Sequence, residues 1–351
     1  MNILLFAGLS DRKLLSKISP LISLDRVEHI YLARNRELKF LKVTSLRLPR
    51  WLKMPILREF VKLLYGIWLG LGAKIDCVIG IYFIPHGILA SFIGRIFGKP
   101  VIQLFIGDDV DAAVRHEKIS PWFLNNARAI GVRGTRSAER LGRVLRGTPN
   151  FFTLPNLFAP PDLDVDGNDP PKEIDLINVG YFDDCKRVDV YLEVVARIRR
   201  KHPHIRSAFA GKDVGGKRAG FEKMRKSLGL EENVRFLGDV EDVFFYLRRS
   251  RVFLMTSESE GMPMAMIEAM SVGLPCVVPD VGDIPDLARD GVNAFIVPPL
   301  DVEAFASKAM SLLEDDGLYR EMSRNARQTI RNREREYGSS HIREIWDKAL
   351  V

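Results

Sequence analysis

Two glutamates around a proline turn mark the stretch of this chain whose residue types best fit chemistry on a charged ligand. Glu260 precedes the turn of residues 261–263, and Glu268 follows eight positions after Glu260. Pro263 suits the first helical position, because its missing N–H is not needed there and its φ is preset. A helix is therefore predicted from near Pro263 to before Gly273. Glu268 falls in its second turn, with its carboxylate leaning back toward Glu260.

The start of that helix is a natural seat for a diphosphate. Its unpaired backbone N–H groups and partial positive charge attract anions, while flanking carboxylates can accept hydrogen bonds from sugar or ribose hydroxyls. The residues that would form this seat are Gly261, Met262, Pro263 and Met264.

Lys186 is a second candidate for phosphate binding. In residues 178–198, NVGYFDDCKRVDVYLEVVARI, a predicted strand runs to Gly180, a polar loop follows, and Lys186 comes just before an amphipathic helix. A lysine in this place can act as a point charge on a phosphate.

Alternating strands and helices are predicted to position these residues. Strand patterns fall at residues 3–8, 29–33, 76–83, 99–107, 129–134 and 150–155, and again at 175–182, 205–211, 234–238, 252–257, 275–280 and 294–298. Helical patterns in the first half fall near 11–23, 56–72, 86–97 and 135–145. This alternation predicts α/β domains with doubly wound parallel sheets, whose ligands bind beyond the carboxyl ends of the strands. Residues 156–173, rich in Pro, Asp, Gly and Asn, are the predicted linker.

The glutamate segment resembles the E-x7-E segment of the retaining glycosyltransferases of family 4, also called group 1. Glu260 and Glu268 stand at the two glutamate positions, and residues 281–316 follow the family's C-terminal layout. The alternative is an αβ unit of any doubly wound domain with incidental acids. The resemblance implies the GT-B fold: two Rossmann-like domains, 1–160 on the acceptor side and 161–334 binding the nucleotide sugar, facing across a cleft. A helix over 335–351 would pack back on the first domain.

The same resemblance implies roles for the donor-side residues. Glu260 would contact the donor sugar hydroxyls and Glu268 the ribose, while Gly180 and Lys186 match the glycine and lysine of the family's diphosphate grip. Tyr181 departs from the pattern, because the family has an arginine there. Arg187 is a candidate substitute, and a solvated charge at a helix start is its other interpretation. Further donor contacts are expected from Gly211, Lys212 and Gly238.

The acceptor side is expected in the first domain. Gly8 ends the first predicted strand and permits close approach of a ligand. Asp109 matches the aspartate of a G-x-D step in the family and completes the catalytic set with Glu260 and Lys186. Ile106 replaces a histidine that some relatives carry. His86 is a further candidate, although a satisfied histidine at a helix start explains it equally well.

Charge is distributed unevenly along the 351 residues. Residues 1–150 hold 24 Lys and Arg against 11 Asp and Glu, a net charge of +13, whereas the remainder has a net charge of −6. Such asymmetry suggests an anionic partner for the first half. In residues 50–74, Arg50, Lys53, Arg58 and Lys62 interleave with Trp51, Phe60, Tyr65 and Trp68. This pattern suits peripheral contact with an anionic membrane, through a helix with one face on the sheet and its basic edge exposed. No nucleic-acid motif is found, so nucleic acid is not an expected partner.

Three widely spaced cysteines without metal-ligand spacing indicate a reduced, cytosolic protein, and no signal peptide is predicted. Neither metal nor organic cofactor is expected. The expected activity is a retaining, hexosyltransferase-type transfer from a nucleotide diphosphate sugar to a glycan or lipid-linked acceptor, in polysaccharide or glycolipid synthesis at the inner face of the membrane. The alternatives are a non-catalytic GT-B paralogue acting as a partner subunit and a GT-B epimerase or phosphorylase.

Overall fold

The computed structural model describes the chain except for residues 50–51, 53, 73, 108, 147–148 and 157–169, and it divides into two compact units. The first comprises Met1–Leu157 and Tyr337–Val351, and the second comprises Phe158–Glu336. Most of the predicted linker lies outside the described residues.

The first unit is built on a sheet of parallel strands in the order β3-β2-β1-β4-β5-β6-β7. These strands are β1 (Asn2–Phe6), β2 (His29–Ala33), β3 (Val43–Ser45), β4 (Cys77–Ile81), β5 (Val101–Leu104), β6 (Ala129–Val132) and β7 (Phe151–Thr153). Its helices are α1 (Asp11–Ile22), α2 (Pro55–Leu71), α3 (Ile88–Phe97), α4 (Asp109–Arg115), α5 (Ser120–Leu124), α6 (Thr135–Val144) and α13 (Ser339–Leu350), and Phe83–Gly87 forms a π-helical turn, η1.

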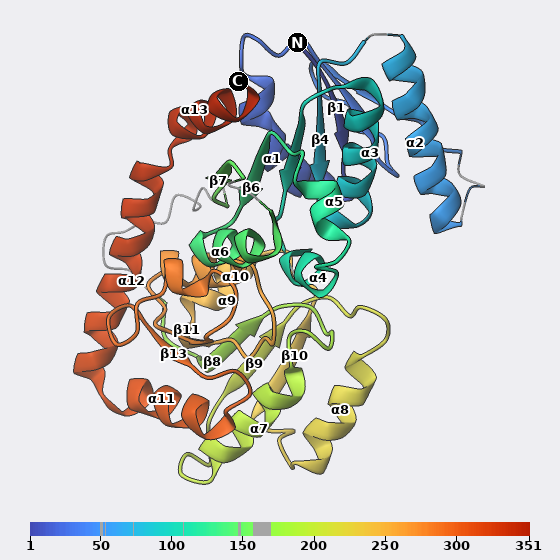
Figure 1. The fold of residues 1–351 in the computed structure, drawn as a ribbon. Helices are drawn as coiled ribbons and strands as arrows, with labels where there is room; N and C mark the ends of the chain where they lie inside the picture. Colours follow the sequence, from blue (N-terminus) through green and yellow to red (C-terminus); the bar gives the residue numbers. More distant parts are fainter. Residues whose placement is uncertain (50–51, 53, 73, 108, 147–148, 157–169) are drawn as a thin grey trace. The chain divides into compact units, whose positions relative to one another are not determined.

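Alternate side chains of β1 pack on opposite faces of this sheet, as the strand period of two requires. Ile3 and Leu5 join the core that contains α1 and α13, whereas Leu4 and Phe6 join the core under α2 and α3. In α13, Trp346 is buried in the first of these cores, and Figure 1 shows that helix beside α1.

The second unit repeats the plan with parallel strands in the order β10-β9-β8-β11-β12-β13. They are β8 (Ile174–Val179), β9 (Ser207–Ala210), β10 (Val234–Gly238), β11 (Ser250–Leu254), β12 (Cys276–Pro279) and β13 (Ala294–Val297). The helices are α7 (Val188–Arg199), α8 (Arg218–Ser227), α9 (Val243–Arg248), α10 (Met264–Ser271), α11 (Val302–Glu314) and α12 (Asp316–Glu336), with a 3₁₀ turn, η2 (Ile284–Asp286). One core lies under α7 and α11, and another under α9, α10 and α12.

The prediction of two doubly wound α/β domains is thus confirmed. Each predicted strand has a counterpart, and so do the four helical stretches predicted in the first half. The short elements β3, α4 and α5 were not predicted.

Helix α2 exposes a different face from the one predicted. Lys62 is fully buried, and the Arg58 guanidinium donates a hydrogen bond to the Leu52 carbonyl over 2.5 Å. The predicted exposed basic edge is therefore wrong for Lys62, since helical periodicity groups residues on a face but does not say which face turns inward. Arg50, Trp51 and Lys53 lie outside the described residues. Among the helices that are described, none combines the length and apolar composition needed to cross a bilayer.

Candidate functional site

The second sheet has a topological switch point between β8 and β11. From β8 the chain proceeds to β9 on one side, and it later returns to add β11 on the other. In parallel doubly wound sheets, ligands bind beyond the carboxyl ends of the strands at such a point. Lys186 lies in the segment that follows β8, and Glu260 lies in the segment that follows β11.

These two predicted residues form a direct ion pair. Lys186 Nζ donates a hydrogen bond to Glu260 Oε1 over 2.5 Å, and the two side chains are 21% and 10% exposed, respectively. Burial alone would lower the pKa of Lys186, but the charge and the hydrogen bond of Glu260 outweigh it and raise the pKa above its ordinary value. Lys186 therefore carries its positive charge throughout the physiological pH range.

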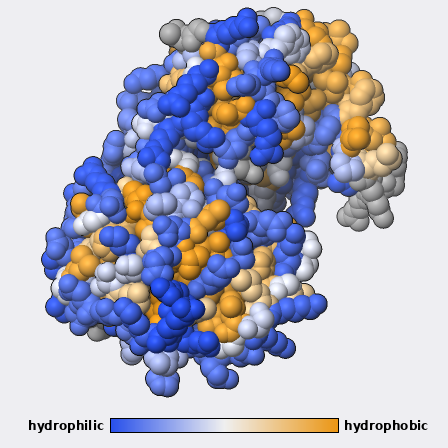
Figure 2. Space-filling view, turned by 60° about the horizontal axis from the view of Figure 1, so that its bottom comes forward, coloured by the Kyte–Doolittle hydropathy of each residue, from blue (hydrophilic) through white to orange (hydrophobic). Residues whose placement is uncertain are grey.

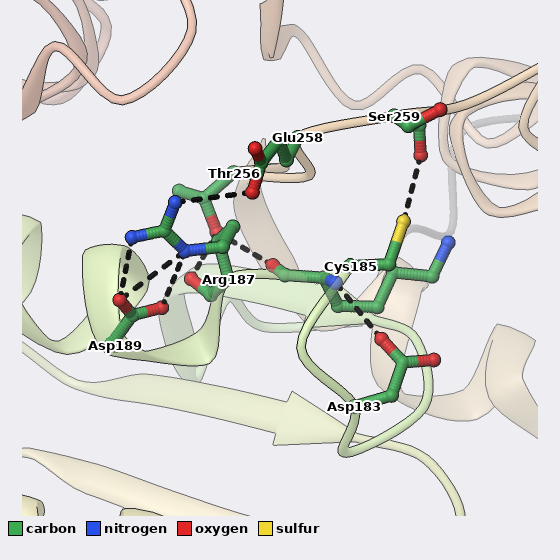
Figure 3. A network of polar contacts seen from close by, with 8 residues as sticks. Asp183, Cys185, Arg187, Asp189, Thr256, Glu258 and Ser259 are labelled. Carbon is green, nitrogen blue, oxygen red and sulfur yellow. Dashed lines mark hydrogen bonds and ion pairs between the residues drawn. The ribbon is translucent and has the colours of Figure 1, made fainter. Parts of the chain in front are cut away.

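The backbone that presents Lys186 is fixed from both sides of the switch point. The Lys186 amide donates to Asp183 Oδ1 over 2.9 Å, and the buried Thr256 hydroxyl bonds the carbonyls of Lys186 and Arg187 at 3.2 and 3.0 Å. Arg187 adopts a left-handed conformation with φ 48°, which costs a non-glycine residue about 1 kcal/mol. Figure 3 shows the two segments lying together. The Thr256 contacts thus stabilise a strained turn that positions Lys186.

Arg187 is engaged elsewhere. Its guanidinium donates to both carboxylate oxygens of Asp189, at 2.7 to 3.2 Å, and to Glu258 Oε2 at 3.2 Å (Figure 3). This arrangement favours the interpretation of Arg187 as a helix-start charge over its role as a substitute for the family's arginine. Tyr181, at that arginine position, is about half exposed.

Cys185 directly precedes Lys186 in the loop that follows β8. Its Sγ donates to the Ser259 carbonyl over 3.1 Å, as drawn in Figure 3. Burial, with a further contribution from the nearby Glu260 carboxylate, raises the pKa of the Cys185 thiol. A raised pKa disfavours the nucleophilic thiolate, so the arrangement does not equip Cys185 as a nucleophile.

Glycines border the carboxyl ends of three neighbouring strands. Gly180 follows β8, Gly211 follows β9, and Gly238 ends β10. A Cβ on Gly211 would lie 1.7 Å from the Gly180 carbonyl oxygen, and one on Gly180 would lie 3.3 Å from the Lys186 side chain. At Gly211, therefore, the backbone is packed too closely for a larger residue. Lys212, the other predicted residue here, is exposed, and its carbonyl accepts from the Phe182 amide over 2.9 Å.

Helix α10 spans Met264–Ser271, close to the predicted bounds. Pro263 is its N-cap residue rather than its first helical residue, and the Pro263 side chain makes no capping hydrogen bond. Gly261, Met262 and Pro263 are buried, whereas Met264 and Glu268 are partly exposed.

The turn before α10 is braced by residues that the sequence analysis did not single out. The Asp283 amide donates to the Gly261 carbonyl over 3.0 Å. Gly282, with φ +53°, would place a Cβ only 1.9 Å from the Glu260 carbonyl oxygen. A Gly-Asp pair directly after a predicted buried strand is the signal that marks these positions. Asp183 and Thr256 had no distinct signal, because their roles depend on contacts between segments far apart in sequence.

Two predicted acceptor-side residues of the first unit lie against each other. Gly8 follows β1 and His86 lies in η1 after β4, at the corresponding switch point of the first sheet. A Cβ on Gly8 would lie 2.7 Å from the His86 ring. His86 Nε2 also lies 3.4 Å from the buried Lys62 Nζ, which donates to Glu59 Oε1 over 2.7 Å. Burial, and then the charge of Lys62, lower the pKa of His86 to about 3, so its ring is neutral.

Asp109 is buried at the start of α4. Its carboxylate accepts hydrogen bonds from the backbone amides of Ile106 at 3.1 Å and Gly107 at 2.9 Å. The side chain therefore shapes the loop that follows β5.

Among the described residues, no group of three or more His, Cys, Asp and Glu side chains is arranged to hold a metal ion. Lys186 pairs with Glu260, the residue directly before the predicted diphosphate seat.

Comparison with known proteins supports the fold and the nature of the second unit. The Bacillus anthracis N-acetyl-alpha-D-glucosaminyl L-malate synthase is 34% identical over 105 residues, which are 30% of this chain and 28% of that protein. An Escherichia coli UDP-Gal:alpha-D-GlcNAc-diphosphoundecaprenol alpha-1,3-galactosyltransferase is 33% identical over 105 residues, or 30% of this chain and 27% of that protein. The chain thus matches less than a third of the length of either relative.

The structure also resembles that of Anabaena HepE solved in complex with UDP-glucose. The TM-score is 0.76, with 16% sequence identity, over 100% of this chain and 99% of that chain. At this identity the likeness concerns the fold alone, and it confirms the predicted GT-B class. Residues 162–329 match the model of the family described as glycosyl transferases group 1. Most of the second unit therefore carries the sequence pattern of the group 1 glycosyl transferase family.

Proposed function

We propose that this chain is a glycosyltransferase that moves a sugar from a nucleoside diphosphate sugar to a glycan or lipid-linked acceptor, with retention of anomeric configuration. The observation that carries the proposal is the Lys186–Glu260 pair at the switch point of the second sheet. It combines a permanent cation with a carboxylate beside a glycine-bordered strand edge. A diphosphate and a sugar are ligands that such a combination can serve.

In the proposed complex, the donor diphosphate lies against Lys186 and the first amides of α10. A helix N-terminus favours anions through its unpaired N–H groups and its dipole, and the N-cap residue of α10, Pro263, has no side chain that could cap it. The glycine edge of Gly180, Gly211 and Gly238 would let the nucleotide approach the backbone.

The two glutamates would bind hydroxyl groups of the donor. Glu260 would exchange its contact with Lys186 for the sugar hydroxyls once the diphosphate draws the lysine away, and Glu268 would reach the ribose. Lys186 and the α10 amides would stabilise the charge that develops on the leaving diphosphate. By the family resemblance, the acceptor would attack on the same face as the departing phosphate, which gives retention.

The acceptor is proposed to lie against the first unit, near Gly8 and His86. Because the His86 ring is neutral, it can offer or accept a hydrogen bond without adding charge. Asp109 would act by holding the loop after β5 in place. The named substrates of the E. coli relative, a UDP sugar and a diphosphoundecaprenol-linked acceptor, support the proposed classes of donor and acceptor.

The test is a thermal shift assay with uridine and guanosine diphosphate sugars, followed by measurement of nucleoside diphosphate release. The full chain is compared with Lys186→Ala and with Lys226→Ala, an exposed lysine on α8 that serves as the matched control. We expect at least one donor to stabilise the wild type and the control but not Lys186→Ala. If no donor stabilises the wild type, the proposal is contradicted.

Activity distinguishes the remaining functions. Release of nucleoside diphosphate that requires an acceptor supports transfer, whereas interconversion of the sugar without release would identify an epimerase. Donor binding with no turnover on any acceptor would favour a non-catalytic partner subunit.

A further inference from the structure

The solvent face of α2 is apolar along its whole length. Its most exposed large side chains are Ile56, Leu57, Phe60, Leu64, Trp68 and Leu71, with Ile56 82% and Leu71 76% exposed. Ile56, Phe60, Leu64 and Trp68 recur every four positions. The helical period of 3.6 residues places Leu57 and Leu71 on the same side of the helix. We call this surface the α2 apolar face.

The charged residues of α2 lie on the other side. Arg58, Glu59 and Lys62 are its only charged residues, and none of them is exposed. Lys62 Nζ donates to Glu59 Oε1 over 2.7 Å and lies 3.4 Å from His86 Nε2. Turning the helix to bury its apolar face would break these contacts, so the exposure of that face is built into the fold.

Neighbouring residues extend the surface and add basic groups. Helix α3 packs against α2, where Ile93 and Phe97 meet Gly66 and Gly70, and it exposes Phe92 and Ile96. Two cations lie over exposed tryptophan rings in this region. Lys74 Nζ lies 5.1 Å from the centre of the Trp68 ring, and the Arg95 guanidinium lies 3.8 Å from the centre of the Trp122 ring. Figure 2 shows hydrophobic side chains gathered at the right-hand edge of the first unit, where α2 lies in Figure 1.

We propose that the α2 apolar face docks on a membrane surface that contains anionic lipid. At about 1.5 Å per residue, the 17-residue helix would lie flat over roughly 25 Å of bilayer, with its apolar side chains inserted at the boundary between headgroups and acyl chains. Tryptophan rings beside basic groups suit that boundary.

Charge selects this occupant over a second copy of the chain. Residues 1–150 carry a net charge of +13, which attracts an anionic leaflet. Two such units brought together would repel each other. The docking differs in kind from the basic-edge contact expected from sequence, because insertion of apolar side chains supplies the main contact and the positive charge of the unit steers it.

The test is co-sedimentation of the full chain with vesicles of phosphatidylcholine alone or with about a third phosphatidylglycerol. We compare the wild type with Ile56→Ser/Phe60→Ser and with Phe245→Ser/Val292→Ser. The control also removes one aromatic and one aliphatic side chain, both exposed on the second unit. Because the substituted side chains are exposed, all three proteins should share one thermal midpoint.

We expect the wild type and the control to bind the anionic vesicles and the α2 variant to lose about tenfold or more in partition coefficient. Brominated acyl chains should quench wild-type tryptophan fluorescence more than that of Trp68→Phe. Equal binding by the α2 variant and the wild type would overturn the proposal, as would failure of the wild type to bind either vesicle. A dimer abolished by Ile56→Ser/Phe60→Ser, with vesicles left unbound, would assign the face to a second copy. No nucleotide sugar is present, so the outcome is independent of the proposed activity.

Discussion

Lys186 and Glu260, 74 residues apart in sequence, meet over 2.5 Å in the segments that follow the neighbouring strands β8 and β11. In this arrangement each neutralises the charge of the other. A bound diphosphate would compete with Glu260 for the lysine. The carboxylate would then be available to the sugar, which links donor binding to the placement of a hydroxyl-binding group.

Replacing Glu260 with glutamine should separate diphosphate binding from turnover. Glu260→Gln removes a negative charge beside the phosphate seat, so affinity for the free nucleoside diphosphate should be kept or rise by up to about tenfold. Turnover should fall about 100-fold or more, because a hydroxyl-binding carboxylate is lost. Calorimetry and a diphosphate release assay measure the two effects. The control, Glu232→Gln, changes an exposed glutamate and should alter neither. Loss of nucleoside diphosphate binding in Glu260→Gln would show that Glu260 does not compete with the phosphate.

The thiol of Cys185 reports on the same carboxylate. After burial, the charge of Glu260 is the next largest cause of the raised pKa of Cys185. Glu260→Gln should therefore lower that pKa and speed labelling by a disulfide reagent at pH 8 by about threefold. Peptide mass analysis identifies the labelled site, since Cys77 and Cys276 are buried. Equal labelling rates at Cys185 in Glu260→Gln and Glu232→Gln would contradict the closeness of the two groups.

Substitution of Gly211 should destabilise the second unit. The added Cβ of Gly211→Ala would lie 1.7 Å from the Gly180 carbonyl oxygen, so β8 and β9 must move apart at their carboxyl ends. We expect a loss of roughly 3 kcal/mol in the free energy of unfolding, measured by urea denaturation. Gly220→Ala in α8 is the control. A Cβ there meets nothing within 4 Å, and the alanine should raise the free energy of unfolding by about 0.5 to 1 kcal/mol. Equal stability of the two variants would refute the close packing at this edge.

His86 should make the first unit less stable in acid. The unfolded histidine titrates near pH 6.5, whereas burial and Lys62 lower the folded pKa to about 3. Between these values the unfolded chain binds a proton that the folded chain excludes. The contribution of His86 is therefore fully present above pH 6.5 and is lost as the pH falls toward 3. By pH 5 the loss amounts to about 2 kcal/mol.

The measurement is urea denaturation at pH 7.5 and pH 5 for the wild type, His86→Gln and His204→Gln. His204→Gln is the control, because it replaces an exposed histidine. His86→Gln should lose less stability between the two pH values than the other two proteins. The same loss in all three would show that His86 titrates normally in the folded chain.

Local patterns were sufficient to predict the alternating elements and to single out Lys186 and Glu260, which the structure brings together. The run from Glu260 through α10 contains a turn, a helix start and a buried strand in continuous sequence, so its bounds could be predicted closely. The pairing of Lys186 with Glu260 could not, because it depends on β8 and β11 being neighbours in the sheet. Thr256 and Asp183 escaped notice for the same reason.

Helix α2 shows the limit of periodicity more clearly. Its spacing of apolar residues predicted an amphipathic helix, and the usual rule places the apolar side inward. In the structure Lys62 is inside, held by Glu59 and His86, and Trp68 is outside. One of the residues that contact Lys62, His86, lies 24 residues further along the chain, so the sequence of the helix alone does not reveal this orientation.

Calorimetric titration of a nucleoside diphosphate into the wild type, Lys186→Ala and Lys226→Ala tests the central claim most directly. The donor nucleotide is chosen from the thermal shift panel. If Lys186 binds the diphosphate, Lys186→Ala should lose about tenfold or more in affinity, while Lys226→Ala should match the wild type. Equal affinity in all three proteins would contradict the assignment of the diphosphate to the Lys186–Glu260 site.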